Sequence, residues 1–351
     1  MAKIIGVETA FPEHRYPQHD VMDMVKNSMP EHGAIIERLN STSGVAFKNL
    51  VLPLDQYPKL GGFEARNQVY LETMVSTLAR AVSKLHLKLG FNWKDIGVIT
   101  STSVTGVAVP TLDARLMNLF PIPHHVVRNP LFGIGCLGGV SGLNRTHDLL
   151  KAYPNKLGLV VAAEACSLTF QLNDVSMANM VACSLFGDGT AAVLLAGDDH
   201  PLAGKARLEI VDSMNTFYPN TERIMGWDML DTGFKVVLSG NVPEIVEKYV
   251  AEDAEAFVNR NGLTLDKIEN LISHPGGPKV LKSVQKVLQK DESLLRHSWE
   301  SLRDNGNMSS VSVLDVLKRS IDQNTLKKGY GVALAMGPAF NSEMSLIKVR
   351  S

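Results

Sequence analysis

The sequence of 351 residues is poor in cysteine and nearly free of net charge, and it lacks long hydrophobic runs. Its three cysteines, Cys136, Cys166 and Cys183, are too few for a disulfide scaffold and lack the C-x-x-C spacing of a zinc site. Lysine and arginine number 35 against 36 acidic residues, so no general attraction to nucleic acid or anionic membranes is expected. The chain shows no signal sequence and no stretch long and apolar enough to span a membrane. We therefore expect a cytoplasmic protein that binds neither nucleic acid nor membranes.

Helical and strand-like segments alternate along the whole chain, which is typical of an α/β fold. The phrase FNWKDIGVITSTS follows one helical stretch, and LTLDKIENLISHPGG follows another much later in the sequence. A second echo pairs FGDGTAAVLLAG, residues 186–197, with KGYGVALAMGPA, residues 328–339. The two echoes occur in the same order and predict an internal duplication, with chance similarity between β/α units as the alternative. Sites in such sheets lie beyond the carboxyl ends of strands, which directs attention to the polar ends STS, HPGG and GNMSS.

One glycine-rich segment, FGIGCLGGVSGL at residues 132–143, admits two interpretations. Residues 133–138 have the spacing G-x-G-x-x-G of a dinucleotide-binding turn, but Cys136 lies in the middle. Such a turn should follow an apolar strand directly and precede an acidic residue by about 20 positions. Here the preceding run, HHVVRNPLF, is interrupted by polar residues and proline, and the next acid, Glu164, lies 26 residues past the last glycine. The dinucleotide interpretation therefore fits poorly.

The alternative interpretation is that Cys136 is a nucleophile at the start of a helix. The following LGGVSGLNRTHDLLKAY has small residues and then helical periodicity. A helix dipole with a neighbouring imidazole lowers the pKa of a thiol from about 8.5 to roughly 3.5–7.5. Without such partners, Cys136 would be a small buried apolar residue, as most free cysteines are.

Two further residues have the properties of partners for this thiol. His274 ends an apolar strand and is followed by Pro275, Gly276 and Gly277, so its surroundings are open. Asn307 lies in a turn at GNMSS before another helical stretch, and its amide can donate hydrogen bonds to a carbonyl oxygen that becomes negative. Together the three residues favour nucleophilic acyl chemistry over a purely structural role.

Four motifs in the sequence carry a specific resemblance to one known family. They are GCLGG at 135–139, LFGDGTAAV at 185–193, SHPGGPKVL at 273–281 and GNMSS at 306–310, and they resemble the type III polyketide synthases, the chalcone synthase-like family. The surroundings of Cys166, ACSLTF, look like those of bacterial members, which argues against a plant flavonoid product. The resemblance implies an α/β, thiolase-like layered αβαβα fold of two similar halves. The nucleophile would lie in residues 1–205 and its partners in residues 206–351, within a homodimer.

The resemblance also implies roles for individual residues. Cys136 matches the family's nucleophile, and His274 and Asn307 match its catalytic partners. Phe186 and Phe234 match two gatekeeper phenylalanines. The remaining matches concern the cavity in which the chain grows: Thr169, Cys166 and Ser309 at its lining, and Val109 at the position that reaches into the cavity of the neighbouring subunit.

The coenzyme A contacts depart from the family pattern. Arg38 matches one of three basic residues that hold coenzyme A phosphates in plant members, but the other two positions hold Ile35 and Thr42. Lys279, just after HPGGP, offers a replacement charge. Delivery of the starter by an acyl carrier protein therefore stays open beside delivery by coenzyme A.

The implied reaction is a decarboxylative Claisen condensation of malonyl-CoA onto an acyl-CoA starter held as a thioester on Cys136, followed by cyclisation. No metal and no redox cofactor is expected. Val109 and Cys166 are smaller or more apolar than their plant counterparts, which favours an aliphatic starter and an alkylpyrone or resorcinol-like product.

Several alternatives stay open at this point. A ketoacyl synthase III-like enzyme would perform a single condensation with a similar residue set. An NAD-dependent oxidoreductase rests on GIGCLG alone. A papain-like protease has Cys, His and Asn in the same order, but its usual motif around the cysteine is missing here. A non-catalytic binding protein is disfavoured by the presence of all three residues.

Overall fold

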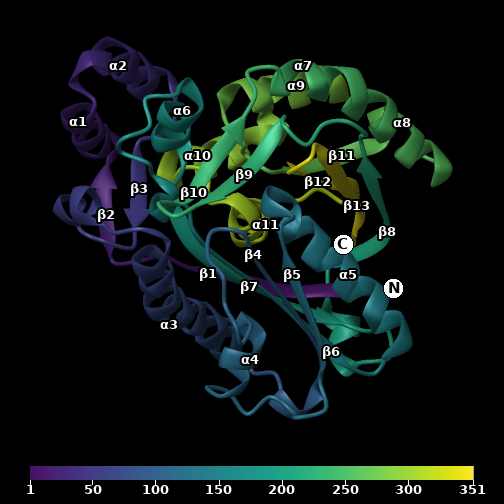
Figure 1. Ribbon diagram of the computed structural model, residues 1–351. Coiled ribbons are helices and arrows are strands. Elements are labelled where there is room, and N and C mark those ends of the chain that lie inside the picture. Colours follow the sequence, from purple (N-terminus) through teal and green to yellow (C-terminus); the bar gives the residue numbers. More distant parts are fainter. Residues whose placement is uncertain (351) are drawn as a thin grey trace.

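A computed structural model describes residues 1–350, and within that range the main feature is a nine-stranded mixed sheet, shown in Figure 1. The strand order is β11-β12-β13-β8-β1-β7-β6-β4-β5. The amino-terminal half of the chain supplies β1 (Lys3–Ala10), β4 (Ile96–Ser103), β5 (Val127–Phe132), β6 (Leu157–Ala165) and β7 (Asp188–Ala196). The carboxyl-terminal half supplies β8 (Leu208–Phe217), β11 (Ile268–Ser273), β12 (Gly329–Gly337) and β13 (Asn341–Val349).

The strand pairing confirms the predicted duplication. In the first half β1 and β7 are antiparallel, β7 and β6 are antiparallel, and β6 and β4 are parallel. In the second half β8, β13, β12 and β11 repeat the same three relations in the same order. The first sequence echo is correct, because β4 and β11 are equivalent. The second echo pairs β7 with β12. It is wrong, because the strand of the second half that is topologically equivalent to β7 is β13.

Helices and sheet halves alternate in layers. Helices α5 (Gly138–Ala152) and α11 (Ser312–Asp322) form the central layer, where they share one apolar core with strands of both halves. Helix α3 (Phe63–Leu89) covers the outer face of the first half, in a second core. Helices α8 (Ala251–Arg260), α9 (Pro278–Leu288) and α10 (Arg296–Asn305) cover the outer face of the second half, in a third core. This arrangement confirms the expected layered αβαβα fold of two similar halves.

The glycines at the start of α5 allow the close packing of the central layer. A Cβ atom on Gly139 would lie 2.4 Å from the carbonyl oxygen of Ser310, and one on Gly138 would lie 2.3 Å from the Thr102 hydroxyl. Real side chains cannot approach so closely. The helix that follows Cys136 therefore lies directly against the segment that precedes α11.

A strand precedes the glycine-rich segment, although polar residues and proline interrupt the apolar run there. Strand β5 ends at Phe132, directly before Gly133, and pairs in parallel with β4. Pro130 lies within this strand, which is possible because β5 is at the edge of the sheet and proline needs no partner on the open side. The expected boundary between residues 205 and 206 lies in the connection from β7 to β8 and stays a prediction.

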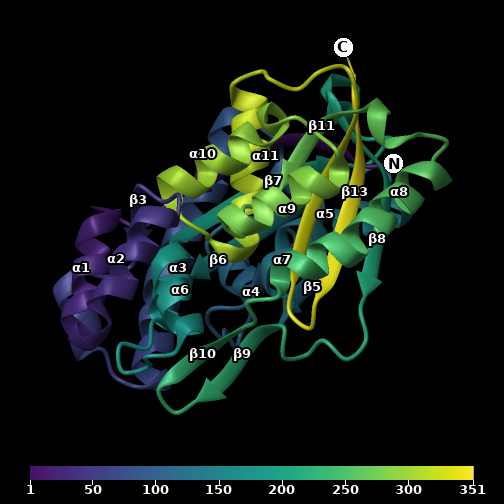
Figure 2. The same ribbon diagram turned by 90° about the horizontal axis from the view of Figure 1, so that it is seen from above.

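Nine further α-helices and strands complete the fold. They are β2 (His14–Pro17), α1 (Gln18–Ser28), α2 (Gly33–Thr42), β3 (Phe47–Leu50), α4 (Leu112–Met117), α6 (Met177–Leu185), β9 (Met225–Leu230), β10 (Gly233–Leu238) and α7 (Val242–Ile245). Five of them, α2, α6, β9, β10 and α7, contribute residues to the cavity described below. Seen from above in Figure 2, the β9–β10 hairpin projects beside α6. Among residues 1–350 no helix combines the length and apolar character needed to cross a membrane.

Candidate active site

Cys136 lies at the amino-terminal end of α5, as predicted. It belongs to the 3₁₀ turn Gly135–Leu137, which continues directly into the helix. Gly135 has a φ of 54°, and a Cβ atom there would lie 2.7 Å from the ring of Pro338, so this position requires glycine. The Cys136 thiol donates a 3.6 Å hydrogen bond to the hydroxyl of Ser309, a residue from the other half of the chain.

His274 follows β11 and is held by its backbone rather than by its ring. Its N–H donates to the carbonyl of Leu334 on β12 at 2.8 Å. The side chain is only 2% exposed, and among residues 1–350 neither ring nitrogen has a hydrogen-bond partner. A buried imidazole with two unpaired nitrogens is costly in a folded protein, and it is a common feature of sites that bind a ligand.

Asn307 connects the parts of the site. Its backbone forms a bridge with Phe186, and its Nδ2 donates to the carbonyl of Gly276, two residues beyond His274, at 3.3 Å. Its Oδ1 accepts from the N–H of Ser309 at 2.9 Å. Because α11 is the topological equivalent of α5, Asn307 occupies the place in the second half that Cys136 occupies in the first.

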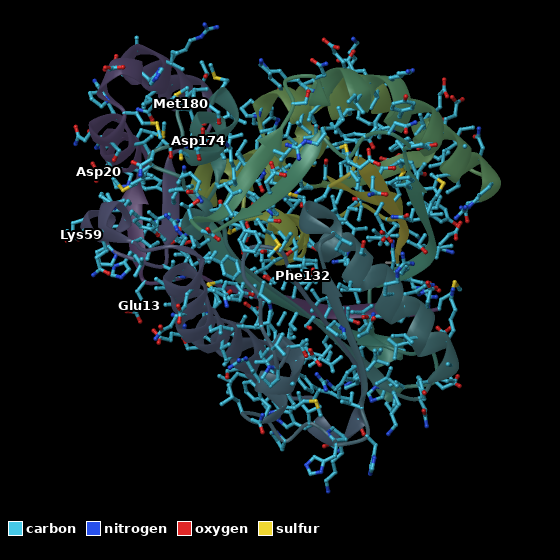
Figure 3. All side chains as sticks on the ribbon, in the orientation of Figure 1. Glu13, Asp20, Lys59, Phe132, Asp174 and Met180 are labelled. Carbon is cyan, nitrogen blue, oxygen red and sulfur yellow. The ribbon has the colours of Figure 1, made fainter. Side chains whose placement is uncertain are left out.

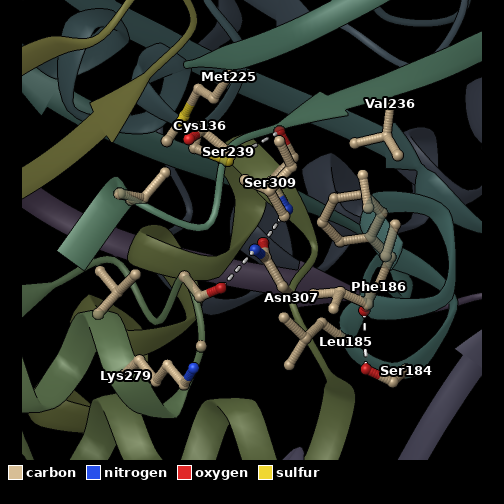
Figure 4. Close-up of a pocket in the computed structure, with 18 of the residues that line it drawn as sticks. Cys136, Ser184, Leu185, Phe186, Met225, Val236, Ser239, Lys279, Asn307 and Ser309 are labelled. Carbon is tan, nitrogen blue, oxygen red and sulfur yellow. Dashed lines mark hydrogen bonds between the residues drawn. The ribbon is translucent and has the colours of Figure 1, made fainter. Parts of the chain in front are cut away.

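Cys136, His274 and Asn307 all line a single cavity of about 580 Å³. Its walls are mostly apolar and come from α2, α6, the β9–β10 hairpin, α7 and the start of α9. In Figure 4 Cys136, Ser309 and Asn307 lie together, and Lys279 lies away from them. The structure thus brings Cys136, His274 and Asn307 to one cavity, and their catalytic roles stay a prediction.

The other predicted site residues fall into two groups. Four of them line the cavity: Phe186, Cys166, Ser309 and Lys279. The other four lie outside its lining within this chain: Phe234, Thr169, Val109 and Arg38.

Of the four residues outside the lining, two are buried and two are exposed. Phe234 is buried behind Trp227, with ring centroids 6.2 Å apart. Thr169 is buried and its hydroxyl donates to the carbonyl of Cys166 at 2.7 Å. Val109 is 85% exposed. Arg38 is exposed on α2, whose Leu39 and Thr42 line the cavity instead.

Sequence reasoning missed Lys282 and Trp227, both of which line the cavity. Lys282 lies three residues after Lys279 on α9, so helical spacing alone would have placed the two side chains on one face. Trp227 lies on β9 in a stretch without a familiar motif, and no pattern in the sequence pointed to it.

The electrostatics differ from the sequence expectation of a low thiol pKa. Burial raises the pKa of Cys136 to about 12, against a smaller lowering by the hydrogen bond to Ser309. Burial lowers the pKa of His274 to about 4. Both shifts disfavour charge, because protein atoms replace the water that would solvate an ion. Both groups are therefore neutral at pH 7.

Glu164, the acid considered for a dinucleotide site, has a different place. It is fully buried and accepts hydrogen bonds from the backbone of Val104 and Thr105, from the Thr105 hydroxyl at 2.7 Å and from the Ser310 hydroxyl. Burial raises its pKa to about 7. Glu164 thus connects β6 by a hydrogen bond to Ser310, close to Asn307. Its carboxylate is therefore not free to bind the ribose of a dinucleotide.

No metal centre accompanies these residues within the described part of the chain, where no three His, Cys, Asp or Glu side chains are grouped to hold an ion. The donors at the cavity are a thiol, an imidazole, an amide and a hydroxyl. This set suits covalent acyl transfer with stabilisation of an oxyanion.

Comparisons with known proteins agree with this geometry. The family model for the amino-terminal domain of chalcone and stilbene synthases matches residues 1–199, and the model for their carboxyl-terminal domain matches residues 209–350. A 1,3,6,8-tetrahydroxynaphthalene synthase from Streptomyces peucetius subsp. caesius is 39% identical over 98% of this chain and 92% of its own. A putative chalcone synthase from Bacillus subtilis is 33% identical over 99% of this chain and 98% of its own.

Solved structures give the same result. The 1,3,6,8-tetrahydroxynaphthalene synthase from Streptomyces coelicolor A3(2), a bacterial type III polyketide synthase, superimposes with a TM-score of 0.90 at 27% identity, covering 99% of both chains. An enzyme from the brown alga Ectocarpus siliculosus, PKS-I, has a TM-score of 0.92 at 23% identity, covering 99% of this chain and 98% of its own. The second likeness concerns the fold alone.

Iodoacetamide alkylates thiolates, so its rate of reaction with Cys136 tests whether His274 accepts the proton of the thiol. We expect His274→Ala to slow alkylation of Cys136 at pH 7 by at least about tenfold, because the buried thiol loses its proton acceptor. Below a raised pKa the thiolate fraction grows about tenfold per pH unit, so the rate in the variant should keep rising up to pH 9.

The measurement is peptide-level mass spectrometry of Cys136, with Cys183 as the internal reference, because burial raises the pKa of that thiol too. Equal rates in the wild type and His274→Ala at pH 7 would show that the imidazole does not accept the thiol proton.

Proposed function

Because this chain belongs to the chalcone and stilbene synthase family and is a type III polyketide synthase, we propose that Cys136, His274 and Asn307 carry out its condensation chemistry. The observation that carries this proposal is their placement at one cavity, with both nitrogens of the buried His274 ring unpartnered among the described residues. A substrate carbonyl oxygen would supply the missing partner.

Acyl loading comes first. His274 takes the proton of the Cys136 thiol, and the sulfur attacks the thioester carbonyl of an acyl-CoA. A new sulfur–carbon bond forms on Cys136, the bond from the carbonyl carbon to the coenzyme A sulfur breaks, and the coenzyme A leaves as a thiol with the proton from His274. The burial that raises the pKa of Cys136 also makes the thiolate strongly reactive once it forms, because it is poorly solvated.

Decarboxylation follows. The thioester oxygen of malonyl-CoA would accept hydrogen bonds from the Asn307 amide and from His274. The carbon–carbon bond to the carboxylate breaks, CO₂ leaves, and the electron pair forms an enolate whose charge lies on that oxygen. The Asn307 hydrogen bond to Gly276 is long, at 3.3 Å, so little is lost when the amide turns to the substrate.

Condensation closes the cycle. The enolate carbon attacks the acyl carbonyl on Cys136, a carbon–carbon bond forms, and the Cys136 sulfur leaves as a thiolate. The chain is now two carbons longer on coenzyme A and can return to Cys136. The apolar walls next to Phe186 would limit the access of water, which would otherwise protonate the enolate.

Two products are compatible with the cavity. Its mostly apolar lining and the small Val104 and Cys166 favour an aliphatic acyl starter and an alkylpyrone or resorcinol-like product. The 39% identity to a 1,3,6,8-tetrahydroxynaphthalene synthase favours instead a polyhydroxylated aromatic product. The two differ in whether an added acyl-CoA enters the product.

Incubation with malonyl-CoA, alone and with acyl-CoAs of increasing length, separates these products by mass. We expect acyl-dependent products in the wild type and none with Cys136→Ala, which should still release CO₂ from malonyl-CoA because His274 and Asn307 remain. We expect Asn307→Ala to lower CO₂ release by about 10² to 10³, the usual cost of one oxyanion donor. Ser184→Ala, at the cavity wall with its hydroxyl bound to Val181, is the matched control.

Product formation by Cys136→Ala would contradict the role of Cys136 as the acyl acceptor. Unchanged CO₂ release by Asn307→Ala would contradict the role of Asn307 as an oxyanion donor. Replacing the acyl-CoA with an acylated carrier protein in the same assay determines which donor delivers the starter.

We further propose that Lys279 and Lys282 hold the phosphates of coenzyme A. Both line the cavity from the first turns of α9, both are exposed, and neither forms a salt bridge with any residue in the range 1–350. The helix begins at Pro278, so its positive end lies beside them. Arg38 lies on the opposite wall helix, α2, and can contribute at longer range.

The double variant Lys279→Ala/Lys282→Ala should raise the KM for malonyl-CoA by about 3- to 10-fold, the range expected for losing two exposed ion pairs, with kcat within twofold. Lys286→Ala is the matched control, because this lysine of the same helix pairs with Glu247 at 2.5 Å. An unchanged KM in the double variant would place the phosphates elsewhere.

We also propose a homodimer formed through the edge of the sheet at β5. The strand pairs only with β4 within residues 1–350, and Phe132 at its end, labelled in Figure 3, is 55% exposed. The segment of Val109, which is 85% exposed, lies beside it because Arg128 on β5 donates to the Thr111 hydroxyl at 2.6 Å. Such apolar exposure at a strand edge is typical of an interface.

Light scattering should give twice the 38.3 kDa of one chain for the wild type and a single chain for Phe132→Asp. Leu87→Asp, on the distant helix α3 and 83% exposed, should keep the wild-type mass. A dimer that survives Phe132→Asp would locate the interface on another face.

A further inference from the structure

The β9–β10 hairpin forms one wall of the cavity with a defined face. In its register Trp227 lies opposite Val236, and Met225 lies opposite Leu238. All four line the cavity, and so does the intervening pair, Gly226 and Val237. The next pair on the same face is Met229 and Phe234, and it lies beyond the cavity lining.

Trp227 is the largest side chain of this wall and lies in a row of aromatic rings. Its centroid is 5.9 Å from that of Phe186 and 6.2 Å from that of Phe234, and Phe234 is in turn 5.4 Å from Phe63 on α3. The row starts at the reacting groups, because the backbone of Phe186 is bridged to Asn307. Within the row, Trp227 therefore lies between Phe186, which is bridged to Asn307, and the buried Phe234.

The hairpin that carries Trp227 is anchored at its tip. Gln171 donates to the carbonyls of Thr232 and Phe234, both at 3.2 Å, and the N–H of Phe63 donates to the carbonyl of Asp231 at 2.7 Å. A salt bridge of 3.4 Å joins Lys235 to Asp174, which Figure 3 labels beside α6. Since the backbone is held, the space at this wall depends on the side chain of Trp227 rather than on movement of the hairpin.

We infer that Trp227 is a specificity-determining residue whose indole sets the length of acyl or polyketide chain that the cavity accepts. The inference rests on the proposed function for the identity of that chain. A chain growing from Cys136 meets Phe186 and then Trp227 along the aromatic row, and removal of the indole opens the space in front of Phe234.

The test compares Trp227→Ala, Trp227→Phe and the control Trp299→Phe, whose indole lies on α10 outside this cavity. Trp227→Ala should shift the preferred acyl-CoA to one at least two carbons longer, with KM for the longer thioester falling by about fourfold per methylene newly accommodated. Trp227→Phe keeps a ring and should lie between the alanine variant and the wild type. Trp299→Phe should match the wild type.

Tryptophan fluorescence provides a readout that does not depend on turnover. A long-chain acyl-CoA should change the emission of the wild type and of Trp299→Phe, and this change should be lost in Trp227→Phe. An unchanged chain-length profile in Trp227→Ala, or a retained emission change in Trp227→Phe, would overturn the inference. Failure of the proposed function would look different, because the wild type itself would then form no polyketide.

Discussion

The site depends on the close contact between two helix starts in the central layer. Helix α5 begins two residues after Cys136, and a 3₁₀ turn, Ser309–Val311, leads from Asn307 into α11. The two segments approach so closely that Gly139 has no room for a Cβ atom beside the Ser310 carbonyl. The Ser309 hydroxyl at 3.6 Å from the Cys136 sulfur is a direct consequence of this contact. Duplication of one β/α unit, with each copy ending near the same point, thus brings residues from distant parts of the chain to one cavity.

The same burial that assembles the site also determines its proton chemistry. Cys136 and His274 each lose the solvation of their charged form, so the pKa of the thiol is about 12 and that of the imidazole about 4. In the proposed reaction, charge develops on the thiol–imidazole pair or on the substrate, where the Asn307 amide and the imidazole would stabilise it. An apolar cavity strengthens those interactions, since little water competes for the donors.

Much of this arrangement could be predicted from the sequence, and the failures have physical causes. The motifs around Cys136, His274 and Asn307 gave the site because each lies at the end of a strand or the start of a helix, where local sequence determines backbone shape. Strand β5 does not stand out in the sequence, because a sheet edge tolerates Pro130 and no local pattern reveals where the edge lies. The thiol pKa was misjudged because desolvation depends on surrounding atoms, and Trp227 was missed because its neighbours are distant in sequence.

The central claim is that one sulfur, that of Cys136, receives the acyl group. The most direct measurement is peptide-level mass spectrometry of the wild-type enzyme after brief incubation with an acyl-CoA in the absence of malonyl-CoA. The account predicts an acyl mass on the peptide that contains Cys136 and none on those that contain Cys166 or Cys183, whose thiols are fully buried. An acyl group found on either of those two cysteines would contradict it. So would the absence of any bound acyl group from a preparation that forms acyl-dependent products once malonyl-CoA is added.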